Sequence, residues 1–223
     1  YANSLSKFIK NSDTPITIGL QGEWGTGKTS LMSLLLENFN EDGNEREIAT
    51  SWVNTWEYSL FKGASETTPA VLSGMLEKLR DENSDIWTIE VAKKKFNEAA
   101  KFFSGLANQV IEKQTGINLK EANKNAKTEK NVAHIVKVKN LITSIINELI
   151  KHSDNKIKKV VFFVDDLDRI PPKDAVEVLE SLKNIFDIPK CVFILAIDYD
   201  VVVTGLESKF GKKTKENERE FRS

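Results

Sequence analysis

The sequence predicts an α/β protein, a three-layer fold in which helices cover both faces of a mainly parallel sheet. After an apolar-striped helix over 2–10, alternating apolar residues run into a glycine-rich loop and an apolar helical stretch over 16–36. Two uninterrupted apolar runs, 160–164 directly after Lys159 and 191–197, have the composition of strands buried on both faces, as in a parallel sheet. Both runs end in acidic residues, at the edge of such a sheet where ligands bind.

The first strand leads into a loop with the pattern Gly, four residues, Gly-Lys-Thr over 22–29. In a strand–loop–helix context this pattern is typical of a phosphate-binding loop, because glycines let successive backbone N–H groups point at phosphate oxygens. We expect Lys28 to bridge the β- and γ-phosphates as a catalytic residue, and Thr29 to ligate Mg²⁺. The alternative is a glycine-rich turn without a ligand. The predicted nucleotide-binding residues are Gly22, Glu23, Trp24, Gly25, Thr26, Gly27, Lys28, Thr29 and Ser30.

Length and composition set broader limits. The chain has 223 residues, which suits one domain, or one domain with a large insertion. Its net charge of −1 gives no sign of nucleic-acid binding, and its single cysteine, Cys191, excludes an internal disulfide and a cysteine-based zinc cluster. With no signal peptide and no transmembrane segment in the sequence, we expect a cytoplasmic location. Because the chain begins with Tyr1, we also expect a fragment of a longer protein, with that protein's other domains as partners.

A second strand is predicted over 48–54, followed by a polar and aromatic cluster. Polar groups that leave the carboxyl end of a strand face the nucleotide crevice of an open α/β sheet, so Asn54 and Glu57 are candidate site residues. Asn54 is a candidate sensor of the bound phosphates. Trp52 and Trp56 are predicted to be core aromatics.

No strand is evident over 59–158, which we interpret as a helical insertion. Apolar stripes over 71–79 and 141–150 predict helices, and 90–113 is also helical and amphipathic in pattern. The lysine-rich run 120–130 resembles a linker. These limits divide the chain into a first core part over 1–58, the insertion, and a second core part over 159–223.

The run 159–164 ends in two neighbouring carboxylates, as the second half of a nucleotide site requires. We expect Asp165 to hold Mg²⁺, mostly through water, and Asp166 to orient or deprotonate an attacking water as a catalytic residue. Asp168 and Arg169 have two interpretations. They form a local salt bridge, or Arg169 neutralises phosphate charge in cis or on a neighbouring subunit, which would require a homo-oligomer.

A helix that opens at Pro171-Pro172 precedes the strand 191–197, which ends at Asp198. If this strand lies between the loop strand and the aspartate strand, Asp198 falls between Lys28 and Asp165, where a polar sensor would detect the γ-phosphate. The tail 209–223 is predicted to be a charge-rich helix or a disordered end. No further strand follows, so we expect the α/β core to be truncated at its C-terminus.

Taken together, these motifs resemble the KAP family of P-loop NTPases, which includes bacterial phage-exclusion proteins and an animal neuronal membrane scaffold. The resemblance implies an ATPase core with an additional strand between the two nucleotide motifs and a large insertion. In several members the insertion carries transmembrane helices, whereas here it has none. The motifs are Tyr1-Ala2 with Phe8-Ile9, Gly22–Thr29 with Trp24 inside it, Trp52–Trp56, Asp165–Arg169 and Phe193–Asp198.

The function expected is that of an Mg²⁺-dependent ATPase domain of a larger KAP-like protein, for which the resemblance implies bacterial anti-phage defence. The alternative is a nucleotide-gated signalling or scaffold switch in which turnover is incidental. Both predict ATP and Mg²⁺ as ligands. A P-loop kinase is a third interpretation, and GTP is disfavoured because the sequence lacks the Asn-Lys-x-Asp pattern of a guanine reader.

Overall fold

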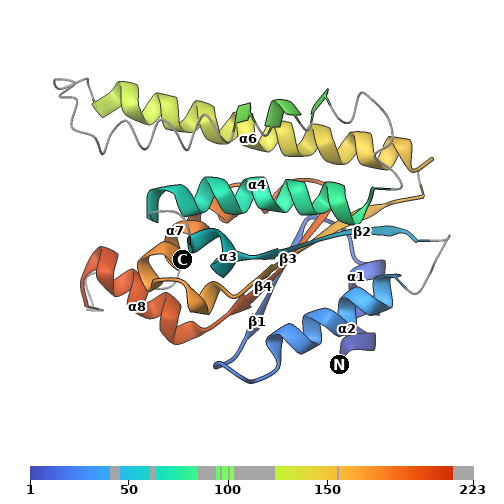
Figure 1. Ribbon diagram of the computed structural model, residues 1–223, viewed down its shortest axis with the longest axis horizontal. Coiled ribbons are helices and arrows are strands. Elements are labelled where there is room, and N and C mark those ends of the chain that lie inside the picture. Colours follow the sequence, from blue (N-terminus) through green and yellow to red (C-terminus); the bar gives the residue numbers. More distant parts are fainter. Residues whose placement is uncertain are drawn as a thin grey trace.

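The described part of the structure, a computed structural model, contains one sheet of four parallel strands (Figure 1). The strands are β1 (Ile16–Gln21), β2 (Ile48–Asn54), β3 (Lys159–Asp165) and β4 (Cys191–Ile197), in the order β1-β4-β3-β2. The predicted α/β fold class is therefore confirmed. The residues described are 1–40, 46–60, 64–84, 94–95, 97–99, 101–102, 124–154 and 156–212.

Helices flank the sheet on both faces and connect its strands. Figure 1 places α1 and α2 together on one side of the sheet and α4 and α6 together on the other. The apolar stripes that predicted helices over 71–79 and 141–150 lie within α4 and α6. The helices are α1 (Ala2–Asn11), α2 (Lys28–Asn40), α3 (Thr55–Ser59), α4 (Ala64–Glu82), α6 (Lys124–His152), the 3₁₀ turn η2 (Leu167–Arg169), α7 (Pro172–Lys183) and α8 (Tyr199–Phe210).

Alternate residues of β3 and β4 point into two separate apolar cores, because successive side chains of a strand face opposite sides. Val161, Phe163 and Ile194 pack with α1 and α2, whereas Phe162 and Phe193 pack with α4, α6 and α7. All five side chains are buried. The central strands are thus covered on both faces, as their uninterrupted apolar runs predicted.

The strand order brings distant segments to one edge of the sheet. Because the strands are parallel, their carboxyl ends lie at the same edge, and β4 lies between β1 and β3. At that edge Gln21 is in register with Ile197, and Asn54 is in register with Asp165. The loop after β1 and the acidic residues after β3 therefore face one another across the end of β4.

The C-terminal end of α4 covers the open edge of β2. The Asn83 Nδ2 donates to the Thr50 carbonyl at 2.9 Å, and the Trp52 N–H donates to the Glu82 carboxylate at 3.1 Å. These side chains take the hydrogen-bonding role of a further strand, which protects an edge that would otherwise be exposed. Burial of Glu82 raises its pKa. The contacts fix β2, and with it the position of Asn54 at the strand end.

Two expectations differ from the structure, and one helix was not expected. The run 120–130 is not a linker beyond residue 123, because α6 begins at Lys124 and continues to His152. Trp52 is partly buried and stacks on Phe163 with 5.2 Å between ring centroids, but Trp56 is 38% exposed and is not a core residue. It lies on α3, a short helix that begins directly after β2 and was not predicted.

Some expectations fall largely outside the described residues. The amphipathic segment 90–113 is described only at 94–95, 97–99 and 101–102, which are helical, and the tail 213–223 is not described. The division into 1–58, 59–158 and 159–223 remains a prediction. No helix within the described ranges has the length and apolar character needed to cross a membrane.

Candidate functional site

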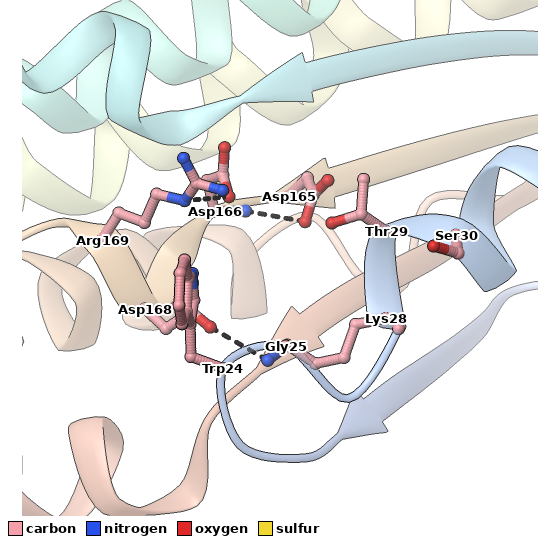
Figure 2. A pocket seen from close by; sticks show the side chains of 10 residues that line it. Trp24, Gly25, Lys28, Thr29, Ser30, Asp165, Asp166, Asp168 and Arg169 are labelled. Carbon is pink, nitrogen blue, oxygen red and sulfur yellow. Dashed lines mark hydrogen bonds and ion pairs between the residues drawn. The ribbon is translucent and has the colours of Figure 1, made fainter.

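A pocket of about 230 Å³ lies between the glycine-rich loop and the end of β3 (Figure 2). Its walls come from two segments far apart in the sequence, one on each side of β4 in the sheet order. The lining residues are Trp24, Gly25, Gly27, Lys28, Thr29, Ser30, Asp165, Asp166, Asp168 and Arg169.

Glycines give the loop its curled backbone. Gly25 and Gly27 have φ values of 83° and 89°, in the region that residues with a side chain rarely adopt. A Cβ at Gly22 would lie 2.4 Å from the Thr26 hydroxyl oxygen, too close for a side chain there. That hydroxyl donates to the Glu23 carbonyl at 2.8 Å and closes the loop from within. The loop is therefore held by contacts among neighbouring residues.

The helix that follows the loop adds the features of an anion site. α2 begins at Lys28, and the Leu31 N–H donates to the Gly27 carbonyl at 2.9 Å. The N–H groups of the first helical residues have no acceptor within the helix, and they carry the positive end of its dipole. Thr29 and Ser30, in this first turn, line the pocket. A phosphate group at this position would meet several convergent donors.

Lys28 spans the two sides of the pocket. Its ammonium donates to the carbonyls of Gly22 and Glu23 at 2.8 and 3.1 Å, and to the Asp168 carboxylate at 2.9 Å. The Lys28 and Asp168 side chains are only 9% and 8% exposed. Asp168 is thus the partner of Lys28 rather than of Arg169, a pairing that the sequence did not predict because 140 positions separate the two residues.

Two carboxylates follow β3 and both reach the same pocket. Asp165 is 4% exposed, and its Oδ1 accepts the N–H of Asp166 at 2.9 Å. Asp166 has a φ of 59°, a left-handed conformation that turns the chain sharply after the strand. The buried Thr55 hydroxyl donates to the Asp165 carbonyl at 2.8 Å. Figure 2 shows the Thr29 hydroxyl and the Asp165 carboxylate pointing toward one another across the pocket.

Asp166 is held by a donor on each of its oxygens. The Arg169 Nε lies 2.6 Å from one oxygen, and the Asn54 Nδ2 donates to the other at 2.6 Å. The Oδ1 of Asn54 accepts the Trp56 N–H at 3.0 Å, which caps α3. Burial raises the pKa of Asp166, and the neighbouring Asp165 carboxylate raises it further. Arg169 thus pairs with Asp166 and Asp168 pairs with Lys28, so the predicted local salt bridge between Asp168 and Arg169 is wrong.

Not every predicted site residue lines the pocket. The Gly22 and Glu23 carbonyls hold Lys28 and the Thr26 hydroxyl closes the loop, whereas the other six of the nine loop residues line the pocket. The strand order puts the residue after β4 between the two walls, but the Asp198 side chain accepts the Asp200 N–H at 3.0 Å and caps α8. Sequence reasoning considered Asp168 only together with Arg169, and it missed that this carboxylate reaches Lys28 and lines the pocket.

The arrangement suits a polyphosphate together with a hard divalent cation. Phosphate charge would meet the loop donors and Lys28 on one wall, and carboxylates on the other wall. The phosphates and these carboxylates would repel each other, and a cation between them would offset the repulsion. Mg²⁺ prefers oxygen ligands such as the Thr29 hydroxyl and the Asp165 carboxylate. The donor set therefore fits Mg²⁺ bound jointly with phosphate.

Comparison with known proteins agrees with this geometry. The family model described as the KAP family P-loop domain matches residues 1–222. A search of curated protein sequences found no match.

Proposed function

The chain belongs to the KAP family of P-loop NTPases, and from this premise we propose that it binds ATP with Mg²⁺ and hydrolyses the γ-phosphoanhydride bond. One observation carries the proposal: the loop residues Lys28 and Thr29 and the strand-end residues Asp165 and Asp166 line a single pocket. The phosphates lie along the loop, where backbone N–H groups and the start of α2 receive them. Lys28 contacts the β- and γ-phosphates.

Thr29 and Asp165 would hold the cation. Asp165 would take part mostly through water, since Mg²⁺ gives up its hydration shell reluctantly. An Mg²⁺ held there would supply positive charge to offset the charge on the phosphates. The hydrogen bond from the Asp166 N–H to the Asp165 Oδ1 keeps that carboxylate turned toward the pocket.

Asp166 orients the attacking water and accepts its proton. Its raised pKa makes the carboxylate a better proton acceptor than an exposed aspartate. Arg169 and Asn54 set the direction of the carboxylate, because each binds one of its oxygens. Asn54 is therefore a positioning residue in this proposal, acting through Asp166, and not a direct sensor of the phosphates.

The test separates hydrolysis from binding. In Asp166→Asn, phosphate release from Mg·ATP should fall by about 10²–10⁴-fold, the usual contribution of a general base, while ATP binding persists. Lys28→Ala should lose both activities. At a ligand concentration about a hundredfold above the Kd, bound ATP should stabilise the wild-type protein by roughly 2.7 kcal/mol in a thermal-shift assay.

The matched control is Asp200→Asn, which removes a charge from the exposed first turn of α8 and should change neither readout. Wild-type turnover in Asp166→Asn would contradict the assignment of the base. If ATP, ADP and GTP with Mg²⁺ all failed to stabilise the wild-type protein, the proposal of a nucleotide site would be wrong.

A second function, a nucleotide-gated switch with little turnover, is favoured by the hydrogen bond and the ion pair of Asp166. Asn54 donates to one oxygen of its carboxylate and the Arg169 guanidinium pairs with the other, each at 2.6 Å, and both partners favour the charged form and so weaken this carboxylate as a base until one of them is released. In this case wild-type turnover would be barely measurable, and Arg169→Ala would increase it. A decrease in Arg169→Ala would favour the ATPase.

The biological output that we propose is a role in bacterial anti-phage defence, as one domain of a larger protein. Family membership supports this output. A gene neighbourhood of defence genes would support it further, and plating of phage on cells with intact or Lys28→Ala protein would test it.

A further inference from the structure

The ammonium group of Lys28 has no donor left for a phosphate. A lysine ammonium carries three N–H donors, and the structure gives it three acceptors: the carbonyls of Gly22 and Glu23 and the Asp168 carboxylate. A phosphate oxygen can therefore form a hydrogen bond with this ammonium only by replacing one of these acceptors or by sharing its proton.

Of the three acceptors, Asp168 is the one that can leave without opening the loop. The Gly22 and Glu23 carbonyls belong to the loop itself, and the Glu23 carbonyl also accepts the Thr26 hydroxyl. Asp168 comes from the opposite wall, on the 3₁₀ turn η2. Its carboxylate is also the acceptor that most resembles a phosphate oxygen, since both are anionic and both form charge-assisted hydrogen bonds.

Electrostatics give the same answer. The Asp168 side chain is 8% exposed and lines the pocket with the carboxylates of Asp165 and Asp166. A nucleoside triphosphate bound beside Lys28 would place further negative charge next to this poorly solvated carboxylate. Asp168 and the phosphates therefore compete for the Lys28 ammonium, and their negative charges repel each other when both are near it.

We propose that Asp168 is a placeholder for phosphate, which occupies Lys28 in the nucleotide-free protein and sets the affinity of the site for nucleoside di- and triphosphates. The inference rests on the proposed function, since it concerns the same pocket. The fraction of protein with Lys28 released from Asp168 limits the apparent affinity, so removal of the carboxylate strengthens binding.

Replacement of Asp168 by phosphate at Lys28 would also change the surroundings of Asp166. Asp168 and Arg169 are neighbours on η2, and the Arg169 N–H donates to the Asp166 carbonyl at 3.2 Å. When phosphate displaces Asp168, the turn that also carries the Arg169–Asp166 ion pair is freed from the loop. The placeholder thus links phosphate binding to the surroundings of the proposed base.

The experiment measures the Kd of Mg·ATP by calorimetry, and the Tm without nucleotide, for wild type, Asp168→Asn and Asp168→Ala. Both variants should bind Mg·ATP about tenfold or more tightly than wild type, while their nucleotide-free Tm falls because Lys28 loses an ionic partner. Mg·ADP should follow the same trend. AMP, which lacks the phosphates that reach Lys28, should show no gain. Asp200→Asn is the control for a general change of charge.

Tighter binding of Mg·ATP together with a lower nucleotide-free Tm in the same variant would identify Asp168 as a placeholder. An unchanged Kd with a lower Tm would mean that Asp168 is only structural, and a weaker Kd would mean that it holds the cation or the substrate; either result overturns the inference. If wild type binds Mg·ATP and the variants do not bind it more tightly, the inference fails and the proposed function stands. If neither the wild type nor either variant binds nucleotide, both the inference and the proposed function fail.

Discussion

The two walls of the pocket are built in different ways. The loop wall is local: its glycines, its internal Thr26–Glu23 hydrogen bond and the start of α2 all lie within residues 22–31. The acidic wall depends on distant partners, because Asp166 is held by Asn54 from β2, 112 positions away, and Asp168 by Lys28, 140 positions away. A local wall can be shaped by a short sequence alone, whereas the acidic wall requires the assembled sheet.

The largest effect on ATP binding should come from breaking the local wall. In Gly27→Ala, the φ of 89° imposes a strain of about 1–2 kcal/mol on a residue with a side chain, and the methyl group enters the phosphate cradle. We expect ATP binding to weaken by about 100-fold or more, or about 2.7 kcal/mol, in a calorimetric titration.

The matched control is Gly19→Ala on β1, where a Cβ would meet Ile197 Cδ1 at an ordinary 3.6 Å. This variant should bind ATP as the wild type does. Equal losses in the two variants would show that the loop geometry is not what receives the phosphates.

A smaller effect should come from loosening the acidic wall at its long-range partner. Asn54→Ala removes the donor to Asp166 and the cap of α3 together. We expect kcat for ATP hydrolysis to fall about 10- to 100-fold, the usual cost of losing an orienting partner, with KM little changed. Loss of the cap should cost about 0.5–2 kcal/mol of stability.

Asn54→Asp separates the two roles. The aspartate keeps an acceptor for the Trp56 N–H, so the cap of α3 should be retained. It cannot donate to Asp166 and its negative charge repels that carboxylate, so kcat should fall. A normal kcat in Asn54→Asp would show that the hydrogen bond to Asp166 does not position the base.

The smallest effect concerns stability. Burial raises the pKa of Asp166 above its ordinary value of 3.8. The folded protein therefore binds this proton more tightly than the unfolded chain, and its stability falls as the pH rises from about 4 through the folded pKa. Asp166→Asn removes this loss, so its Tm should exceed that of the wild type at pH 7, by about 2–4 °C per kcal/mol regained.

The sign of the Tm difference between Asp166→Asn and wild type, measured as a function of pH, tests this prediction. Below the ordinary aspartate pKa of 3.8, where the wild-type carboxyl becomes protonated in both the folded and the unfolded protein, the Tm gain of Asp166→Asn should disappear. Asp200→Asn, at an exposed position, should show no such pH dependence. A variant less stable than wild type at pH 7 would mean that the ion pair with Arg169 outweighs the cost of burying the charge.

The pattern of apolar residues predicted much of the fold because the spacing of apolar residues in a segment indicates which of its faces are buried. The runs at β3 and β4 are buried on both faces as predicted. The same reasoning failed at Trp56, where an aromatic residue is 38% exposed on α3. It also failed at Lys124, where a polar, lysine-rich segment continues into α6. Composition indicates whether a segment can be buried, but it does not say which tertiary surface is present to bury it.

The sequence by itself determined the phosphate-loop pattern of residues 22–29 and the buried strand that ends at Asp165, since both depend on neighbouring residues. Only the tertiary structure decided which side chains meet. The order β1-β4-β3-β2 brings Lys28 to Asp168, and the register of β2 with β3 brings Asn54 to Asp166. The side chain of Asp198 instead caps α8 and is not among the residues that line the pocket. Strand order and register are properties of the whole sheet, and no short stretch of sequence contains them.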